Sequence, residues 1–174
     1  MASRTGSARL TLFLLCCTGT WLASHLTSIH EPPAADRRKI ISMLEKLSWK
    51  LLEGYLAKEK GVQETKRYSL PCSTAPSQPA DLVNSSAIMP YFQAIKPLLP
   101  DLAEGGTEPP LSRLVDEIIE QLDKLKAPHE PETTVALPPG NFQQKSFIVT
   151  ILKRFLKCMQ VKSALLNPGT QRVM

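Results

Sequence analysis

The sequence predicts an all-α fold, and within that class an up-up-down-down four-helix bundle. Four stretches of the chain place apolar residues at helical spacing, and no run alternates apolar and polar residues long enough to indicate a strand. Two long, proline-bearing connections give the chain room to cross the length of a bundle, so that consecutive helices run parallel. Short connections would have predicted a simple antiparallel bundle instead.

Residues 1–23 have the features of a secretory signal peptide. Arg4 and Arg9 form a basic start, an apolar run follows over 10–17, and Ala23 offers a small residue for cleavage, although cleavage after Gly19 or Ser24 stays open. The apolar run is too short to span a bilayer. We therefore expect a secreted, extracellular product of residues 24–174, with no membrane insertion.

Charge does not predict a nucleic-acid partner. The whole chain has a formal net charge of +5, and loss of the two signal-peptide arginines leaves 19 basic against 16 acidic residues, or +3. That excess is too small to indicate binding to a polyanion.

The first two helices are predicted over about 34–59 and 86–96. The first carries one apolar stripe and is bounded by Pro33 and Gly61, and the second begins with Ser85 or Ser86 as its cap. The stripe of the first helix consists of Ile40, Leu44, Leu47, Leu51 and Tyr55.

The third and fourth helices are predicted over about 111–126 and 142–166. The third has an unbroken stripe of Leu, Val and Ile, and the fourth opens with Asn141 and Gln144 at capping-box spacing and ends before Asn167. The long connections are residues 60–85 and residues 127–140, and each is long enough to act as a crossover.

Trp49 lies on the opposite side of the first helix from the apolar stripe. A large apolar side chain in that position needs a cover, and we expect the crossover over 60–85 to pack on it. The alternative is an anchor for a receptor, because Trp is enriched among interface hot spots.

The cysteines predict one disulfide and no metal site. Cys16 and Cys17 leave with the signal peptide, so Cys72 and Cys158 remain as a pair in an oxidising compartment. A nucleophilic or metal-binding thiol has no support, because no C-x-x-C is present and the three histidines are scattered. We expect no cofactor.

Enzyme chemistry is not supported either. The glycines form no phosphate-binding motif, and no histidine has an assignable nucleophile beside it. The carboxylates of Asp116, Glu117 and Glu120 fit a solvated helix face, with Glu120 one turn before Lys124.

Several blocks of sequence closely resemble the interleukin-31 family of mammals. They are LPC at 70–72, SSAIMPYFQAIKPL at 85–98, VDEIIEQLDKLK at 115–126, HEPET at 129–133 and KSFIVTIL at 145–152. The resemblance implies a monomeric four-helix cytokine that bridges a dedicated interleukin-31 receptor subunit and the oncostatin-M receptor subunit. JAK-STAT signalling in immune, epithelial and sensory cells follows from the same resemblance.

The resemblance also implies roles for individual residues. Phe142 and Lys145 match an F-x-x-K pattern that related cytokines use on their shared receptor chain, and Glu117 matches a residue that meets the dedicated chain. Ser42 and Met43 depart from the acidic residues of the family, so that part of the contact does not carry over. Residues 99–110 are longer than the corresponding link of the family.

The helical register of Phe142 agrees with a receptor role. Phe142 points away from the apolar stripe of the fourth helix, with Lys145 at the edge of that stripe. The alternative is a local hydrophobic cap in which Phe142 folds back onto Val135 or Leu137.

Two further expectations complete the prediction. Asn84, in the sequence Asn-Ser-Ser, is expected to be glycosylated, because the sequon lies on a polar connection before a helix.

The competing class of protein is a secreted, amphipathic, helical lipid-binding protein, since helices with basic residues also bind lipid surfaces.

Overall fold

The computed structural model describes residues 32–72, 82–100, 109–126 and 134–166. These residues form four α-helices and one short 3-10 helix, with no strand among them, so the all-α prediction is confirmed. The elements are α2 (Ala34–Lys58), α3 (Ser85–Ile95), η1 (Lys96–Leu98), α4 (Leu111–Asp123) and α5 (Asn141–Leu166). The expected signal peptide lies outside the described residues.

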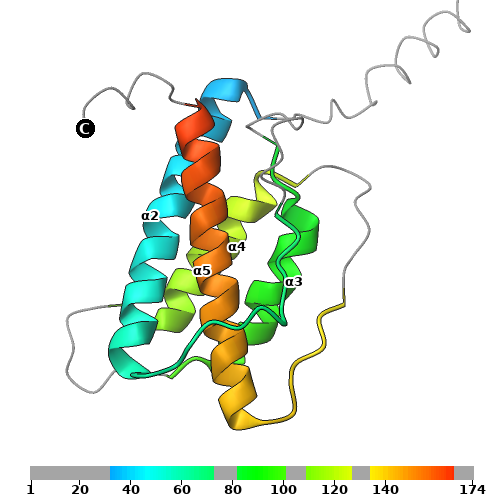
Figure 1. The fold of residues 1–174 in the computed structure, drawn as a ribbon. Helices are drawn as coiled ribbons and strands as arrows, with labels where there is room; N and C mark the ends of the chain where they lie inside the picture. The colour runs from blue at the N-terminus through cyan, green and yellow to red at the C-terminus, as the bar shows by residue number, and fades with distance from the viewer. Residues whose placement is uncertain (1–31, 73–81, 101–108, 127–133, 167–174) are drawn as a thin grey trace, which may run out of the picture. The chain divides into compact units, whose positions relative to one another are not determined.

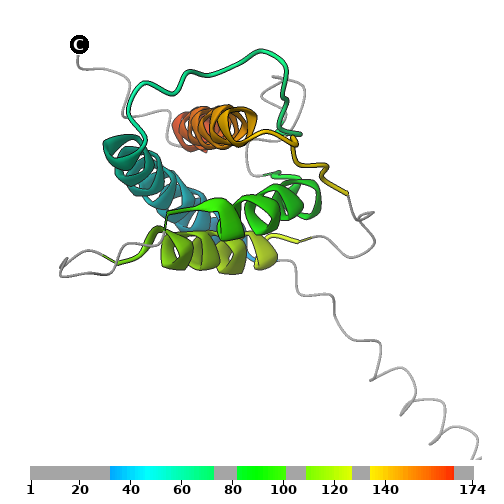
Figure 2. The same ribbon diagram turned by 90° about the horizontal axis from the view of Figure 1, so that it is seen from below.

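The helices have the predicted directions. Figure 1 shows α2 and α3 running one way and α4 and α5 running the other way, which is the up-up-down-down arrangement. Viewed along the bundle in Figure 2, α5 lies beside α2, and α4 lies beside α3. Helix α4 also packs against α2.

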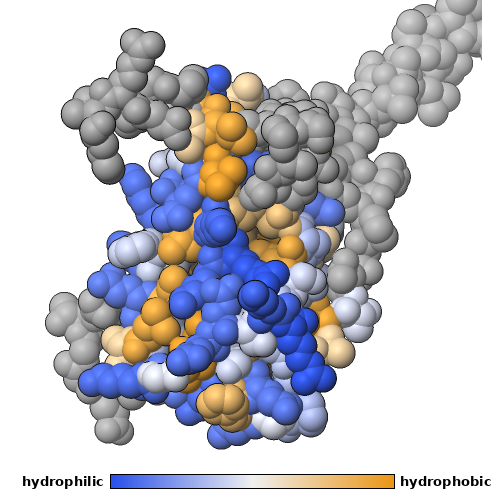
Figure 3. Space-filling model, viewed as in Figure 1, coloured by the Kyte–Doolittle hydropathy of each residue, from blue (hydrophilic) through white to orange (hydrophobic). Residues whose placement is uncertain are grey.

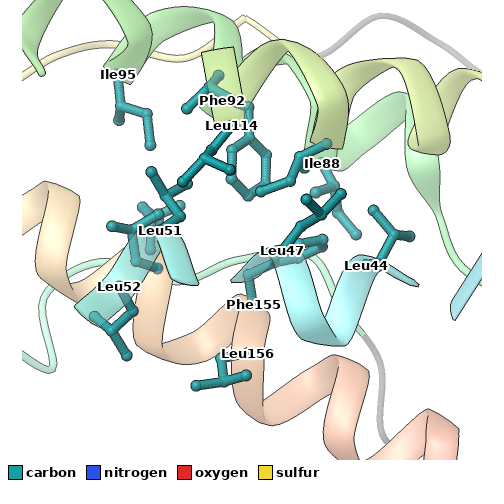
Figure 4. Packing of buried hydrophobic residues seen from close by; sticks show 14 of the residues in the cluster. Leu44, Leu47, Leu51, Leu52, Ile88, Phe92, Ile95, Leu114, Phe155 and Leu156 are labelled. Atoms are coloured by element: carbon teal, nitrogen blue, oxygen red, sulfur yellow. The ribbon is translucent and has the colours of Figure 1, made fainter. Parts of the chain in front are cut away.

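The apolar stripes meet in one core between the helices. Figure 4 shows leucines of α2, Ile88 and Phe92 of α3, and Phe155 of α5 directed toward one another. The rings of Phe92 and Phe155 pack edge to face with centroids 4.7 Å apart. Removal of this apolar surface from water is the main favourable term for the fold.

The stripe of α2 is wider than predicted. Ile41, Ser48 and Leu52 are buried as well, whereas Ile40 is only partly buried. Because α2 packs against both α4 and α5, it buries two adjacent sides rather than one. The buried Ser48 hydroxyl is satisfied by the carbonyl of Leu44, one turn earlier.

Helix α3 begins one residue earlier than predicted, because its cap is Asn84 rather than a serine. The Oδ1 atom of Asn84 accepts a hydrogen bond of 3.1 Å from the backbone N–H of Ala87. This bond satisfies one of the unpaired donors of the first turn.

The first crossover follows the outer side of α5 (Figure 2). The backbone N–H of Thr65 donates to Thr150 Oγ1 at 3.0 Å, and the ring of Tyr68 packs edge-on against Phe147. A disulfide then joins Cys72 to Cys158, with Cα atoms 6.2 Å apart. The crossover is therefore attached along α5 rather than along α2.

None of the described helices combines the length and the apolar character that a membrane span requires.

Candidate functional site

Phe142 lies at the start of α5 and is 72% exposed. The buried residues of α5 begin one turn later at Ser146, and every residue from there to Leu152 is buried, on all sides of the helix. Phe142 is exposed because it precedes this buried stretch. The expected alternative, a cap in which Phe142 is covered by Val135 or Leu137, is not formed at this exposure. A phenylalanine ring in water on a rigid helix end is suited to binding an apolar pocket of another molecule.

Lys145 lies one turn after Phe142, and its ammonium group has a partner that the sequence did not reveal. Its Nζ atom is 2.7 Å from Oε2 of Glu59, the C-cap residue that follows α2. The side chains are 35% and 22% exposed, so this ion pair is partly shielded from water. The two residues are 86 positions apart, and only the packing of α2 against α5 brings them together.

Glu59 also acts on Tyr55, one turn earlier in α2. Burial, with a smaller contribution from the negative charge of Glu59, raises the pKa of Tyr55 to about 12. The end of the bundle where α2 stops and α5 starts therefore holds a buried phenol, a carboxylate and an ammonium, and the ammonium belongs to the residue one turn after Phe142.

Glu117 lies on α4 and is distant in sequence from this group. Its Oε1 atom is 3.4 Å from Nε of Arg113, and both side chains are substantially exposed. The neighbouring acids have separate partners, because Asp116 pairs with Lys96 and Glu120 pairs with Lys124. The carboxylates thus form a solvated face on which each acid pairs with its own cation.

Trp49 is 56% exposed, so the expected cover over it is wrong for the described part of the crossover. Residues 60–72 are held against α5 by their contacts with Phe147, Thr150 and Cys158, which draws them away from the free side of α2. Trp49 instead lines a groove of about 410 Å³ between α2 and α5. The groove is lined by Glu45, Lys46, Trp49, Lys50, Leu156 and Gln160.

Asn84 is exposed at the start of α3. Because its Oδ1 atom caps the helix, the Nδ2 atom that would carry a glycan is not the atom used in the cap. The cap and a glycan on Asn84 are therefore chemically compatible.

No cluster of three or more His, Cys, Asp or Glu side chains that could hold a metal ion occurs among the described residues. The three histidines lie outside those residues.

Comparison with known proteins gives one consistent result. The family model for Interleukin 31 matches residues 24–164. Interleukin-31 of Homo sapiens is 37% identical over 173 residues, which cover 99% of this chain and 98% of the human one. Interleukin-31 of Mus musculus is 28% identical over 165 residues, covering 91% and 93% of the two chains. No solved structure matches significantly.

Proposed function

This chain belongs to the interleukin-31 family, and is therefore a cytokine and not an enzyme, and from that premise we propose that it bridges a two-chain cell-surface receptor. The two chains are the dedicated interleukin-31 receptor subunit and the oncostatin-M receptor subunit. Their association on the membrane activates JAK-STAT signalling in immune, epithelial and sensory cells. The cytokine acts as a secreted monomer, released after removal of residues 1–23.

The exposure of Phe142 is the observation that carries this proposal. An aromatic side chain that is 72% exposed gains the most when a partner buries it, and the adjacent Lys145 adds a charge that selects an acidic pocket. We assign this pair to the oncostatin-M receptor subunit.

Lys145 can exchange Glu59 for a receptor carboxylate with little loss of free energy. Partly exposed ion pairs contribute about 1 kcal/mol or less, so a receptor carboxylate can replace or share Glu59 at Lys145 with little loss. In the free cytokine, the Glu59 carboxylate holds the Lys145 ammonium at the end of the bundle, at a distance of 2.7 Å. Binding then begins from an ordered lysine rather than from a freely rotating one.

Glu117 is assigned to the dedicated subunit. Its carboxylate is accessible on α4, and its partner among the described residues is the exposed Arg113, so a cationic group on a receptor chain can reach it. Asp116 and Glu120 lie near it on α4, but each already pairs with a lysine.

The test is the double variant Phe142→Ala with Lys145→Ala, measured by surface binding to each receptor ectodomain and by STAT phosphorylation in cells with both chains. Loss of a central aromatic anchor costs about 2 kcal/mol or more, which is about a 30-fold loss of affinity. We expect the variant to lose binding to the oncostatin-M receptor subunit and to lose signalling, while it still binds the dedicated subunit.

A matched control removes an exposed apolar residue and an exposed cation elsewhere, Leu165→Ala with Lys126→Ala. It should bind both ectodomains normally. Glu59→Gln should also keep binding of the oncostatin-M receptor subunit, since the receptor acid replaces the lost partner. The assignment is wrong if the folded double variant recruits both chains with wild-type affinity.

The lipid-binding alternative has weaker support. The large exposed apolar side chains of the described residues come from separate elements, including Leu82 before α3 and Leu137 before α5, and do not form one helix stripe. Binding to phosphatidylcholine vesicles without binding to either ectodomain would favour that alternative.

A further inference from the structure

The free side of α2 carries two exposed apolar side chains on a continuous surface. Met43 is 49% exposed and Trp49 is 56% exposed. Met43 lines a hollow of about 380 Å³, and Trp49 lines the groove between α2 and α5, and Lys46 borders both. Figure 3 shows hydrophobic side chains exposed between hydrophilic ones on the face that α2 and α5 form.

The floor of the α2–α5 groove is apolar. Trp49 contributes its indole ring from α2, and Leu156 contributes its side chain from α5. Leu156 is buried, so it forms a wall of the groove that is already part of the core. A groove of this kind accepts one apolar side chain without rearrangement of the bundle.

The rim of the groove is cationic. Lys46 and Lys50 border it on α2, and Lys153 and Lys157 flank Leu156 on α5. None of these four lysines forms an ion pair in the described part of the chain. By contrast, Lys96, Lys124 and Lys145 on other faces each have a carboxylate partner.

The apolar floor and the cationic rim together indicate what kind of molecule the groove binds. Among the described residues that line the groove, Glu45 is the one acid beside Lys46 and Lys50, so the local charge favours an anionic partner. A second copy of the chain would bring a second set of lysines and would be repelled. A sulfated polysaccharide would pair with the lysines but would leave the floor of Trp49 and Leu156 without an apolar partner. An acidic protein surface with one apolar side chain would pair with the lysines and also fill the apolar floor.

We propose that the α2–α5 groove, with Trp49 as its anchor, binds an acidic, apolar-tipped segment of the dedicated receptor subunit. This inference rests on the proposed two-chain receptor and extends the contact with the dedicated chain across α2. Phe142 precedes Leu156 by 14 residues on the same helix, which corresponds to about 21 Å. Two receptor chains can therefore occupy the groove and the start of α5 at once.

The experiment measures binding of three variants to the dedicated ectodomain and to the oncostatin-M receptor ectodomain. The variants are Trp49→Ala, Trp49→Phe, and Lys46→Glu with Lys50→Glu. Trp49→Ala should weaken binding to the dedicated ectodomain at least tenfold, and Trp49→Phe should restore most of it because the ring is kept. The double charge reversal should slow association and flatten its dependence on ionic strength.

The matched control is Lys66→Glu with Lys126→Glu, which makes the same change in net charge at exposed lysines that border neither hollow. It should bind as the wild type does. Melting temperatures should agree among all variants, because Trp49 and both pairs of lysines are exposed.

The outcomes separate this inference from the proposed function. If the wild type binds neither ectodomain, the proposed function fails. If the wild type binds the dedicated ectodomain and the Trp49→Ala and charge-reversal variants bind it equally well, the inference is overturned. It is also overturned if the variants keep receptor binding and lose only binding to heparin. The same holds if they lose only a self-association that sedimentation detects for the wild type.

Discussion

Tyr55 lies in α2 with 1% of its surface exposed, one turn before Glu59. An ionised phenolate at this position would lose its hydration and would face a carboxylate, so the neutral form is strongly preferred. The end of the bundle proposed to bind a receptor thus contains a buried group whose protonation depends on the fold. Glu59 links that group to Lys145 and, through it, to the start of α5.

The raised pKa of Tyr55 predicts a loss of stability at alkaline pH. The unfolded phenol titrates near its ordinary value of 10, and the folded one near 12. Below pH 10 both states hold the proton and the stability is complete, whereas between pH 10 and 12 only the unfolded state releases it, so the free energy of unfolding falls by up to about 2 kcal/mol.

Urea unfolding from pH 8 to pH 11.5 measures this loss. Tyr55→Phe should show a shallower decline than the wild type, because it has no phenol to ionise at this site. Equal slopes for the two proteins would contradict the assignment.

Helix α3 shows how one side chain supports an entire element. It has 11 residues and contains Pro90, which cannot donate a backbone hydrogen bond inside the helix. A short helix with a missing bond depends strongly on its cap and on its packing. Asn84 supplies the cap, and Ile88, Phe92 and Ile95 supply the packing.

Substitution of Asn84 separates the cap from the predicted glycan. In unglycosylated protein from bacteria, Asn84→Ala should lower the free energy of unfolding by about 1 kcal/mol, and Asn84→Asp should be close to the wild type because Asp also caps helices. In secreted protein from eukaryotic cells, both variants should run at the mobility of the deglycosylated wild type. A wild type whose mobility does not change after glycosidase treatment would contradict glycosylation at Asn84.

The disulfide organises the whole molecule. It joins the first crossover to the last helix across 86 positions, and the contacts of Thr65 and Tyr68 with α5 extend the attachment along that helix. The crossover is consequently a layer on α5, and the free side of α2 is left open around Trp49. Both candidate contacts on α5, at Phe142 and beside Leu156, are positioned by this arrangement.

Removal of the disulfide by Cys72→Ser with Cys158→Ser should lower the free energy of unfolding by about 4.5 kcal/mol in a chain-entropy estimate. Thermal unfolding with and without reductant checks this value, because reductant should lower the melting temperature of the wild type and leave the double variant unchanged. Peptide mapping of folded, secreted wild type without reduction should find the two cysteines linked. Two free thiols in that material would contradict the bridge.

Local sequence determined the helices and their directions. The i, i+3, i+4 spacing of Leu, Val and Ile predicted α4 from its first residue, and the lengths of the two connections predicted the parallel pairs. The register of Phe142 on α5 also predicted that it faces away from the apolar stripe, but its exposure depends on its place at the helix end, because Val149 on the same side is buried. The receptor roles came from the family resemblance and not from periodicity.

Contacts between distant segments were decided only by the tertiary structure. The pairing of Glu59 with Lys145, the open groove beside Trp49 and the course of residues 60–72 along α5 all depend on how α2 and α5 pack and on where the disulfide holds the crossover. Helical periodicity identifies which side of a helix is apolar, but it does not show which helix or connection packs against each side. That neighbour is selected by side-chain packing and charge across the whole bundle, which no local stretch of sequence encodes.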